Sequence, residues 1–332
     1  MSSHLHHKTL GRRSPSRLLS VTAVLALGVA GWGVPGAVQP EPADAATDTG
    51  WNLGKYLGVW NYDQPNRESM RNIAELRCPA AQPDCPSPVP GSTPGSAVQI
   101  PQIGWILFSK ESDGRIVGRT DRGCTYRFKA QSDSLQLDPP SQHCFNRVIN
   151  SGYTLTRWSV TVSGRHEKET IAGVSHGPNG DYAFVLDRGA RTKVEPEPWG
   201  KVAKRFTGRW AYVPADRSRL INMVTYRSVG PDGSMQVSQA HQRGLVAMTV
   251  KPDRAVVART ADGCRWTLAV RGNTAELNPP GQVCQRPGET VTVDFWQVAS
   301  DGKEQASIMS GVVRRDGLNS SFVLNVGALA RR

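Results

Sequence analysis

Apolar and polar residues alternate along most of the chain with a period of two, which is typical of strands with one buried and one solvated face. From Cys264 to Val270, for example, every second residue is apolar and the residues between them are Arg, Thr and Ala. Such runs are separated by Pro-Asp-Gly, Asp-Gly, Gly-Asn and Asn-Pro-Pro-Gly sequences, which favour tight turns. The pattern predicts an all-β protein built as an antiparallel meander of short strands.

The sequence contains the same unit twice. Residues 123–144, GCTYRFKAQSDSLQLDPPSQHC, align without a gap with residues 263–284, GCRWTLAVRGNTAELNPPGQVC. Downstream, Trp158 and Trp296 continue the match, each followed after the same interval by a Phe-Val-Leu sequence. Internal repetition over this length indicates duplication of a whole domain.

Each copy is a meander that would leave long sheet edges exposed if it stayed open. Closure removes such edges, so the sequence predicts two tandem antiparallel up-and-down β-barrels, with a folded-over sandwich as the alternative. A short linker with two prolines, Val194–Gly200, separates the copies. The predicted organisation is a signal peptide over 1–45, a first barrel over 46–195 with a Pro-rich, Cys-containing insertion over 78–101, and a second barrel over 196–332.

The first residues have the features of an export signal. Basic residues without any acid precede an uncharged, apolar stretch from Leu18 to Val38. Ala43-Asp44-Ala45 offers small residues for cleavage before Ala46, and an earlier cut after Ala37 is an alternative. Arg12-Arg13 leaves the twin-arginine route open beside the general secretory route. We therefore expect a secreted protein without stable membrane insertion after cleavage, with a retained anchor as the alternative.

The net charge of the chain limits the classes of partner that it is expected to bind. Lys and Arg total 40 against 28 Asp and Glu, which gives a formal net charge of +12. The basic residues are scattered and no run of five like charges occurs, so nucleic acid is not the expected partner. Attraction to anionic surfaces, including cell-envelope polymers, is the safer expectation.

The six cysteines fit an oxidising compartment. Cys124 and Cys144 occupy the same repeat positions as Cys264 and Cys284, so of the 15 ways of pairing six cysteines we favour these two bonds. Cys78 and Cys85 remain and would close a small loop within the Pro-rich insertion. No metal site is expected, because neither copy has a CxxC pair and the histidines that follow the predicted signal peptide are isolated and not shared between the copies.

A Gly-x-Trp sequence opens each copy, as Gly58-Val59-Trp60 and Gly208-Arg209-Trp210. Followed by a meander, it resembles the first strand of the calycin superfamily, the lipocalin-like barrels. The resemblance implies that Trp60 and Trp210 are structural residues at the closed end of an eight-stranded barrel, whose other end opens to a pocket for a small apolar ligand. The chain is also similar to secreted bacterial repeat proteins without a known activity.

Shared aromatic and basic residues are the candidates for ligand contact. Trp158, Trp296, Tyr126 and Trp266 occupy alternating strand positions, where an aromatic residue is either core or a pocket wall. Two arginines are also shared between the copies, Arg119 and Arg259. They would either neutralise an acidic ligand inside a barrel or serve as structural arginines at strand ends.

One motif is typical of an enzyme. Gly173-Val174-Ser175-His176-Gly177 matches the nucleophile elbow of α/β-hydrolases, which requires a strand, a sharp turn and then a helix. Here a turn and another strand follow. A serine hydrolase using Ser175 is therefore a remote alternative.

The sequence thus predicts a secreted, non-enzymatic binding protein without a cofactor, whose barrels hold a small apolar or amphipathic ligand. The alternative is an extracellular interaction protein that binds a protein or a cell-envelope polymer through its loops. The identity of the ligand and the oligomeric state do not follow from the sequence.

Overall fold

The computed structural model describes residues 52–332 except 89–92, 149–150, 178–179 and 231. The predicted signal peptide, its cleavage sites and its alternatives as an anchor lie outside these residues. Within the described part of the chain, no helix combines the length and the apolar character needed to span a membrane.

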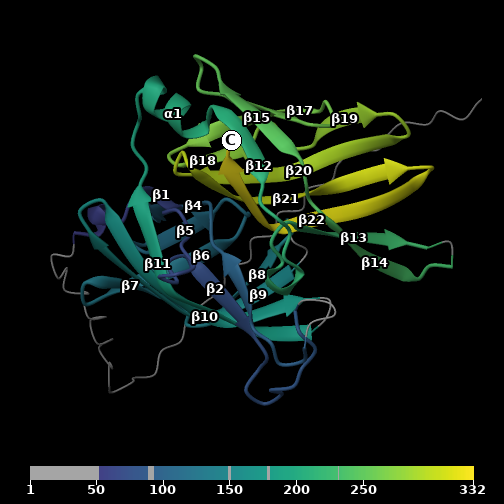
Figure 1. The fold of residues 1–332 in the computed structure, drawn as a ribbon. Coiled ribbons are helices and arrows are strands. Elements are labelled where there is room, and N and C mark those ends of the chain that lie inside the picture. The colour runs from purple at the N-terminus through teal and green to yellow at the C-terminus, as the bar shows by residue number, and fades with distance from the viewer. Residues whose placement is uncertain (1–51, 89–92, 149–150, 178–179, 231) are drawn as a thin grey trace, which may run out of the picture. The chain divides into compact units, whose positions relative to one another are not determined.

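The first repeat forms a closed, eight-stranded antiparallel barrel (Figure 1). Around the ring the strands are β1 (Gly58–Tyr62), β4 (Trp105–Lys110), β5 (Ile116–Thr120), β6 (Thr125–Gln131), β7 (Ser134–Leu137), β9 (Ser151–Ser163), β10 (His166–Gly177) and β11 (Gly180–Lys193). Pairing of β1 with β11 closes it. Three further strands attach outside the ring: β2 (Ile73–Arg77), β3 (Val98–Pro101) and β8 (Gln142–Asn146).

The second repeat has the same topology strand for strand. Its ring contains β12 (Gly208–Tyr212), β15 (Leu245–Val250), β16 (Val256–Thr260), β17 (Arg265–Arg271), β18 (Thr274–Leu277), β20 (Glu289–Ser300), β21 (Glu304–Arg315) and β22 (Leu318–Arg331). Outside it are β13 (Met223–Val229), β14 (Met235–His241) and β19 (Gln282–Arg286). The prediction of an all-β chain with two antiparallel barrels is confirmed, and the sandwich alternative is wrong.

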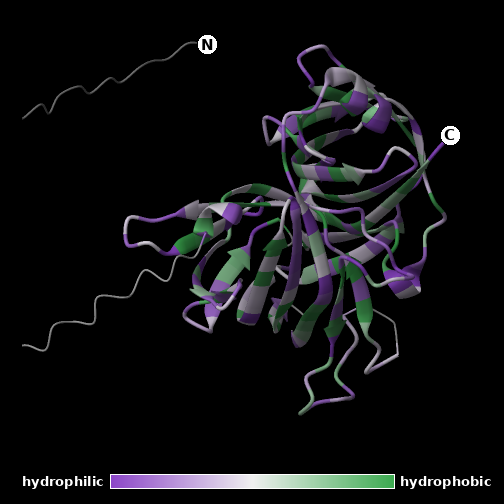
Figure 2. Cartoon of the chain, turned by 90° about the vertical axis from the view of Figure 1, so that its left-hand side faces the viewer, coloured by the Kyte–Doolittle hydropathy of each residue, from purple (hydrophilic) through white to green (hydrophobic). Residues whose placement is uncertain are grey.

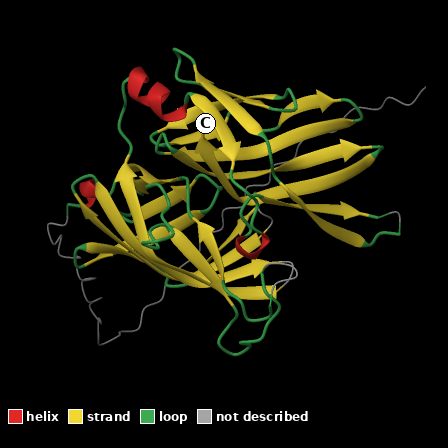
Figure 3. Ribbon diagram, in the orientation of Figure 1, coloured by secondary structure: helices red, strands yellow, loops and turns green. Residues whose placement is uncertain are grey.

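Helices are few among the described residues (Figure 3). One α-helix, α1 (Trp199–Phe206), precedes the second barrel, and two short 3₁₀ turns are η1 (Leu53–Lys55) and η2 (Arg217–Arg219). Along the strands hydrophobic and hydrophilic positions alternate (Figure 2), as the period of two predicts. One side of each strand therefore packs inside the barrel.

A β-bulge bends the longest strands at the same place in both barrels. Between β10 and β11, Glu169 pairs with Gly189 and Ile171 with Leu186, so two residues of β11 face one of β10. Between β21 and β22 the corresponding shift lies between Ser307 and Met309. A bulge bends a strand and increases its twist. The long strands can thus close the ring with one half and pair with the additional strands with the other.

Trp60 and Trp210 are fully buried in equivalent environments. Trp60 Nε1 donates a hydrogen bond to the Tyr56 carbonyl at 2.7 Å, and Trp210 Nε1 donates to the Phe206 carbonyl at 2.9 Å. A cation lies over each indole ring: Lys193 Nζ at 5.5 Å from the centroid of Trp60 and the Arg331 guanidinium at 4.8 Å from that of Trp210. Burial with a satisfied indole N–H and a cation–π contact indicates a structural position.

The three predicted disulfides are confirmed as Cys78–Cys85, Cys124–Cys144 and Cys264–Cys284. The last two join equivalent places in the two barrels. Stable disulfides are typical of proteins outside the reducing cytoplasm. The structure therefore supports an extracytoplasmic location.

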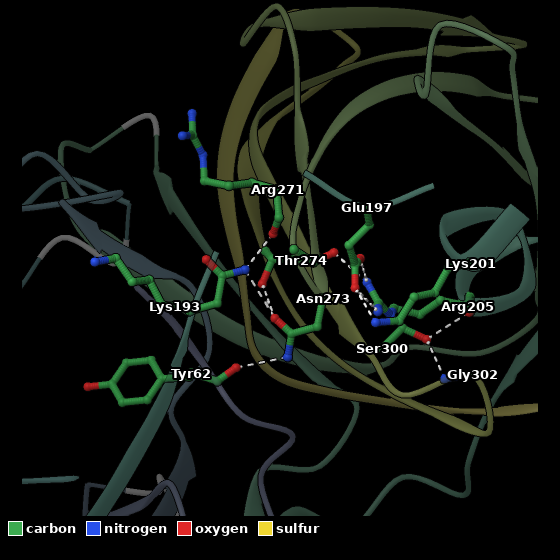
Figure 4. A network of polar contacts seen from close by, with 12 residues as sticks. Tyr62, Lys193, Glu197, Lys201, Arg205, Arg271, Asn273, Thr274, Ser300 and Gly302 are labelled. Carbon is green, nitrogen blue, oxygen red and sulfur yellow. Dashed lines mark hydrogen bonds and ion pairs between the residues drawn. The ribbon is translucent and has the colours of Figure 1, made fainter. Parts of the chain in front are cut away.

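Polar residues also connect the two repeats (Figure 4). Asn61 Nδ2 donates to Asn273 Oδ1 at 3.1 Å, and Asn273 Nδ2 donates to the Tyr62 carbonyl at 2.8 Å. In the same network, Arg205 of α1 binds both carboxylate oxygens of Glu197, at 2.7 and 3.0 Å. The linker is thus held by specific hydrogen bonds.

Candidate functional site

The first barrel contains a cavity of about 110 Å³. Its wall is formed by residues of the barrel strands, and the segments Gln102–Trp105 and Thr120–Arg122 border it. Six aromatic side chains line the cavity: Tyr62, Trp105, Tyr126, Tyr153, Trp158 and Phe184. Polar residues on the same lining include Asp121, Asn146 and Arg191. An aromatic cavity with a few placed polar groups is the usual form of a small-molecule site.

Trp158 and Tyr126, two of the predicted ligand-contact residues, form part of this wall. Their rings meet edge to face with centroids 5.2 Å apart. Both side chains are buried, on β9 and β6 respectively. The alternation of each strand turns these residues inward, where they border the cavity. Contact with a ligand stays a prediction for both.

Behind Trp158 lies a buried cluster of three ionisable side chains, which we call the charged triad: Glu167, Glu169 and Arg191. Arg191 Nη1 donates to Glu167 Oε1 at 2.8 Å and to Glu169 Oε2 at 2.7 Å. Trp158 Nε1 donates to the same Glu169 oxygen at 2.8 Å. All three members are at most 3% exposed, so water screens these interactions little.

The charges of the triad do not balance when all its members are ionised. Two carboxylates face one guanidinium, which leaves a net negative charge in a buried place. Burial, reinforced by the neighbouring Glu169 carboxylate and opposed by Arg191, raises the pKa of Glu167 to about 8. Burial also raises the pKa of Asp121 on the cavity lining. The first barrel therefore holds a proton at neutral pH that an exposed carboxyl would release.

This proton makes stability depend on pH. The folded protein keeps Glu167 protonated up to a pKa of about 8, whereas the unfolded chain releases the proton near 4.5. Between these values the folded state binds more protons, so the free energy of unfolding should fall as pH rises from about 5 to about 8. Thermal unfolding across this range should show the decline, and Glu167→Gln should flatten it. An equally steep decline in the variant would contradict the assignment.

The second barrel replaces the charged triad with neutral residues. Repeat positions equivalent to Glu167, Glu169 and Arg191 hold Gln305, Ser307 and Leu329. Trp296 Nε1 donates to Ser307 Oγ at 3.0 Å, where Trp158 donates to a carboxylate. Trp296 and Trp266, the other predicted aromatic contacts, are buried in the apolar core of this barrel. The two copies thus share a scaffold but differ in interior chemistry.

Neither predicted arginine borders the cavity. Arg119 on β5 and Arg259 on β16 are exposed, and Arg119 Nη1 donates to Ser109 Oγ at 2.9 Å. Two other arginines, Arg122 and Arg191, line the cavity. Sequence reasoning missed Arg191 because its repeat partner is Leu329. A signal was available: an arginine at a strand position that is apolar in the other copy.

The structure gives Ser175 a different context from that of a nucleophile elbow. Its motif lies within β10, and the strand β11 begins at Gly180, where a hydrolase would have a helix. Ser175 is buried, and its hydroxyl lies 3.2 Å from that of Ser151. His176 Nδ1 lies 2.8 Å from Asp181 Oδ1, and its Nε2 contacts Thr154. The serine therefore contacts another serine, while the histidine contacts different residues.

No protein-family model and no curated protein matches this chain. Among solved structures, the chain is similar to the crystal structure of "a putative outer membrane protein" from Bacteroides fragilis, with 8% identity and a TM-score of 0.25 over 84% of this chain and 98% of that one. A TM-score this low carries no argument about structure or function.

Proposed function

We propose that the protein is a secreted, non-catalytic binding protein whose first barrel holds a small amphipathic ligand. The observation that carries the proposal is the cavity itself, which is lined by six aromatic side chains and a buried arginine. Aromatic side chains that line a cavity pack against the flat apolar part of a ligand, and a polar group on the lining fixes the orientation of that ligand.

Arg191 indicates what kind of polar group the ligand carries. Its Nη1 is occupied by both glutamates, but its Nε has no hydrogen-bond partner among the described residues. A buried N–H without a partner is unfavourable, because the group has lost its bond to water. A ligand with a carbonyl, carboxylate or hydroxyl oxygen would satisfy this donor once the guanidinium turns toward the cavity that Arg191 lines. The volume of about 110 Å³ is smaller than the about 150 Å³ of an apolar cavity that accepts benzene, so a single ring is the largest body that the cavity can take, and a substituent on the ring must project out of it.

The remaining features support the same function. The three disulfides and the predicted signal peptide agree with an extracellular protein that must persist without chaperones. The second barrel, with its neutral interior, would stabilise the chain rather than bind the same ligand. Interaction with another protein is a second candidate function, which a groove on the outside of the first barrel favours.

Titration of the oxidised, signal-free protein tests the proposal. We expect acetophenone, an aromatic ketone, to bind saturably at one site per chain by NMR. Ethylbenzene has nearly the same shape but no acceptor and should bind more weakly. Ile171→Phe adds bulk to the cavity lining and should weaken acetophenone binding at least tenfold.

A matched control uses the duplication. Met309 is the repeat equivalent of Ile171 in the second barrel, so Met309→Phe should leave acetophenone binding unchanged. Thermal unfolding of both variants shows whether each is folded. No saturable binding by the wild type, or equal loss in both folded variants, would refute a ligand site in the first barrel.

A further inference from the structure

The bulge of the long strands forms a groove on the outside of each barrel. In the first barrel this outer groove has a volume of about 610 Å³. It lies where Asp187 and Arg188 of β11 face Thr170 of β10. In the second barrel Asn325 and Val326 face Ile308 in the same arrangement. The two grooves are thus structural equivalents.

The groove of the second barrel holds a segment of the same chain. Ile103, in the connection between β3 and β4, is 4% exposed and belongs to one apolar cluster with Phe295, Ala299 and Ile308. Val326 and Gly327 line a small pocket together with Gln102 and Ile103 of the same segment. This bulge therefore forms a surface on which an irregular peptide segment docks.

The groove of the first barrel has the same backbone but different side chains. Lys168, Thr170 and Arg188 stand where the second barrel has Ala306, Ile308 and Val326. Thr161 likewise replaces Ala299. Lys168, Arg188 and Thr161 are exposed, whereas Val326, Ile308 and Ala299 are buried. The surface that is apolar in the second barrel is therefore polar and basic in the first.

The outer groove of the first barrel carries an excess of positive charge. Arg71, Lys168 and Arg188 line it, and none of them forms an ion pair with a described residue. Arg188 donates to the Ser69 carbonyl at 3.0 Å, and Arg71 to the Gln64 carbonyl at 3.2 Å. The lining contains two acidic residues. Asp187 is exposed, whereas Glu169 is buried and binds Arg191 in the interior.

We propose that this outer groove binds an acidic peptide segment of a partner protein. The equivalent groove shows that the bulge accepts a peptide chain, and the three cations favour carboxylate side chains on it. A second copy of this chain fits poorly, because the segment equivalent to that of Ile103 carries Arg243. That arginine would face Lys168 and Arg188. The proposal does not depend on the cavity inside the barrel.

The chain itself supplies a probe. A fluorescein-labelled peptide with the sequence of residues 98–105, carrying Ile100→Glu and Ile103→Glu, keeps the segment that docks on the second barrel and adds two carboxylates. We expect saturable binding to the full mature protein by fluorescence anisotropy, weakening as salt rises. The same peptide with Ile100→Lys and Ile103→Lys should bind at least tenfold more weakly.

Charge reversal locates the site. Lys168→Glu/Arg188→Glu should weaken binding of the acidic peptide at least tenfold. The control Lys110→Glu/Arg265→Glu changes net charge equally at exposed positions outside the groove and should leave binding within twofold. Acetophenone binding and thermal unfolding of each variant report on the fold independently of the groove.

Three results would overturn the proposal. These are no binding of the acidic peptide, equal weakening by both charge-reversal pairs, or equal affinity for the acidic and basic peptides. If inorganic polyphosphate binds through Lys168 and Arg188 while the acidic peptide does not, the groove is a site for a non-peptide polyanion. As a gain-of-function test, Lys168→Ala/Thr170→Ile/Arg188→Val should bind the unmodified peptide better than wild type, and failure to do so in a folded variant would count against peptide docking.

Discussion

Arg191→Leu is expected to lower the free energy of unfolding by about 3–5 kcal/mol, because removing one partner of a buried ion pair leaves its charge uncompensated. The substitution would remove the cation from both Glu167 and Glu169, which lie 2.8 and 2.7 Å from Arg191 Nη1. The measurement is the denaturant midpoint of the oxidised mature chain at pH 8. At pH 5 the loss should be smaller, because Glu167 is protonated there and its carboxyl carries no charge that the substitution would leave uncompensated.

The second barrel provides the matched control for this experiment. Glu167→Gln/Glu169→Ser/Arg191→Leu installs the residues found at Gln305, Ser307 and Leu329. Replacing a whole buried ionic cluster with neutral residues is often neutral or stabilising. We therefore expect the triple variant to be clearly more stable than Arg191→Leu alone. Equal destabilisation of the two would show that the loss comes from shape and not from charge.

The two equivalent tryptophans should respond differently to truncation. Trp296→Ala should lower the free energy of unfolding by about 3–5 kcal/mol, because it leaves a void in a packed core. Trp158 lines a cavity, so its removal enlarges an existing space, and Trp158→Ala should destabilise less and mainly reduce acetophenone binding. Denaturant midpoints and NMR titrations of both variants make the comparison.

Trp158→Phe separates two contributions of the same side chain. It keeps a ring at the cavity wall but removes the N–H that binds Glu169 at 2.8 Å. We expect this variant to retain acetophenone binding while losing some stability. If Trp158→Ala destabilises as strongly as Trp296→Ala and wild type binds no acetophenone, the first barrel is filled and not a carrier.

The barrel architecture and the disulfides could be predicted because each depends on local pattern repeated twice. The alternation in Cys264–Val270 and its counterpart determines which side chains face inward. Two cysteines occur at equivalent positions in each copy, which limits the ways in which the six cysteines can form disulfides. Closure of β1 onto β11 was expected only in general terms, because pairing between distant strands depends on twist and bulges that a period of two does not encode.

The charged triad could not be predicted for a physical reason. Glu167 and Glu169 alternate with His166 and Lys168, so the strand reads as a solvated stretch with no apolar face at all. They are buried because they share the inward side of β10 with Ile171 and because Arg191 compensates them from β11. Sequence periodicity records polarity but not the pairing that makes a buried charge tolerable.

The cations over Trp60 and Trp210 were missed for a related reason. Lys193 and Arg331 occupy equivalent positions at the ends of β11 and β22. They differ in residue type, and a search for identical residues between the copies passes over them. Their shared chemistry becomes visible once the strands are placed side by side.

The neutral interior of the second barrel has a consequence for how the two halves tolerate mutation. A domain whose interior holds a charged cluster and a cavity tolerates less further destabilisation, because proteins remain folded only above a stability threshold. Duplication lets one half keep a well-packed interior while the other departs from it. Substitutions inside β20–β22 should therefore act mostly through the amount of folded protein. Those at the cavity of the first barrel can change recognition while the protein stays abundant.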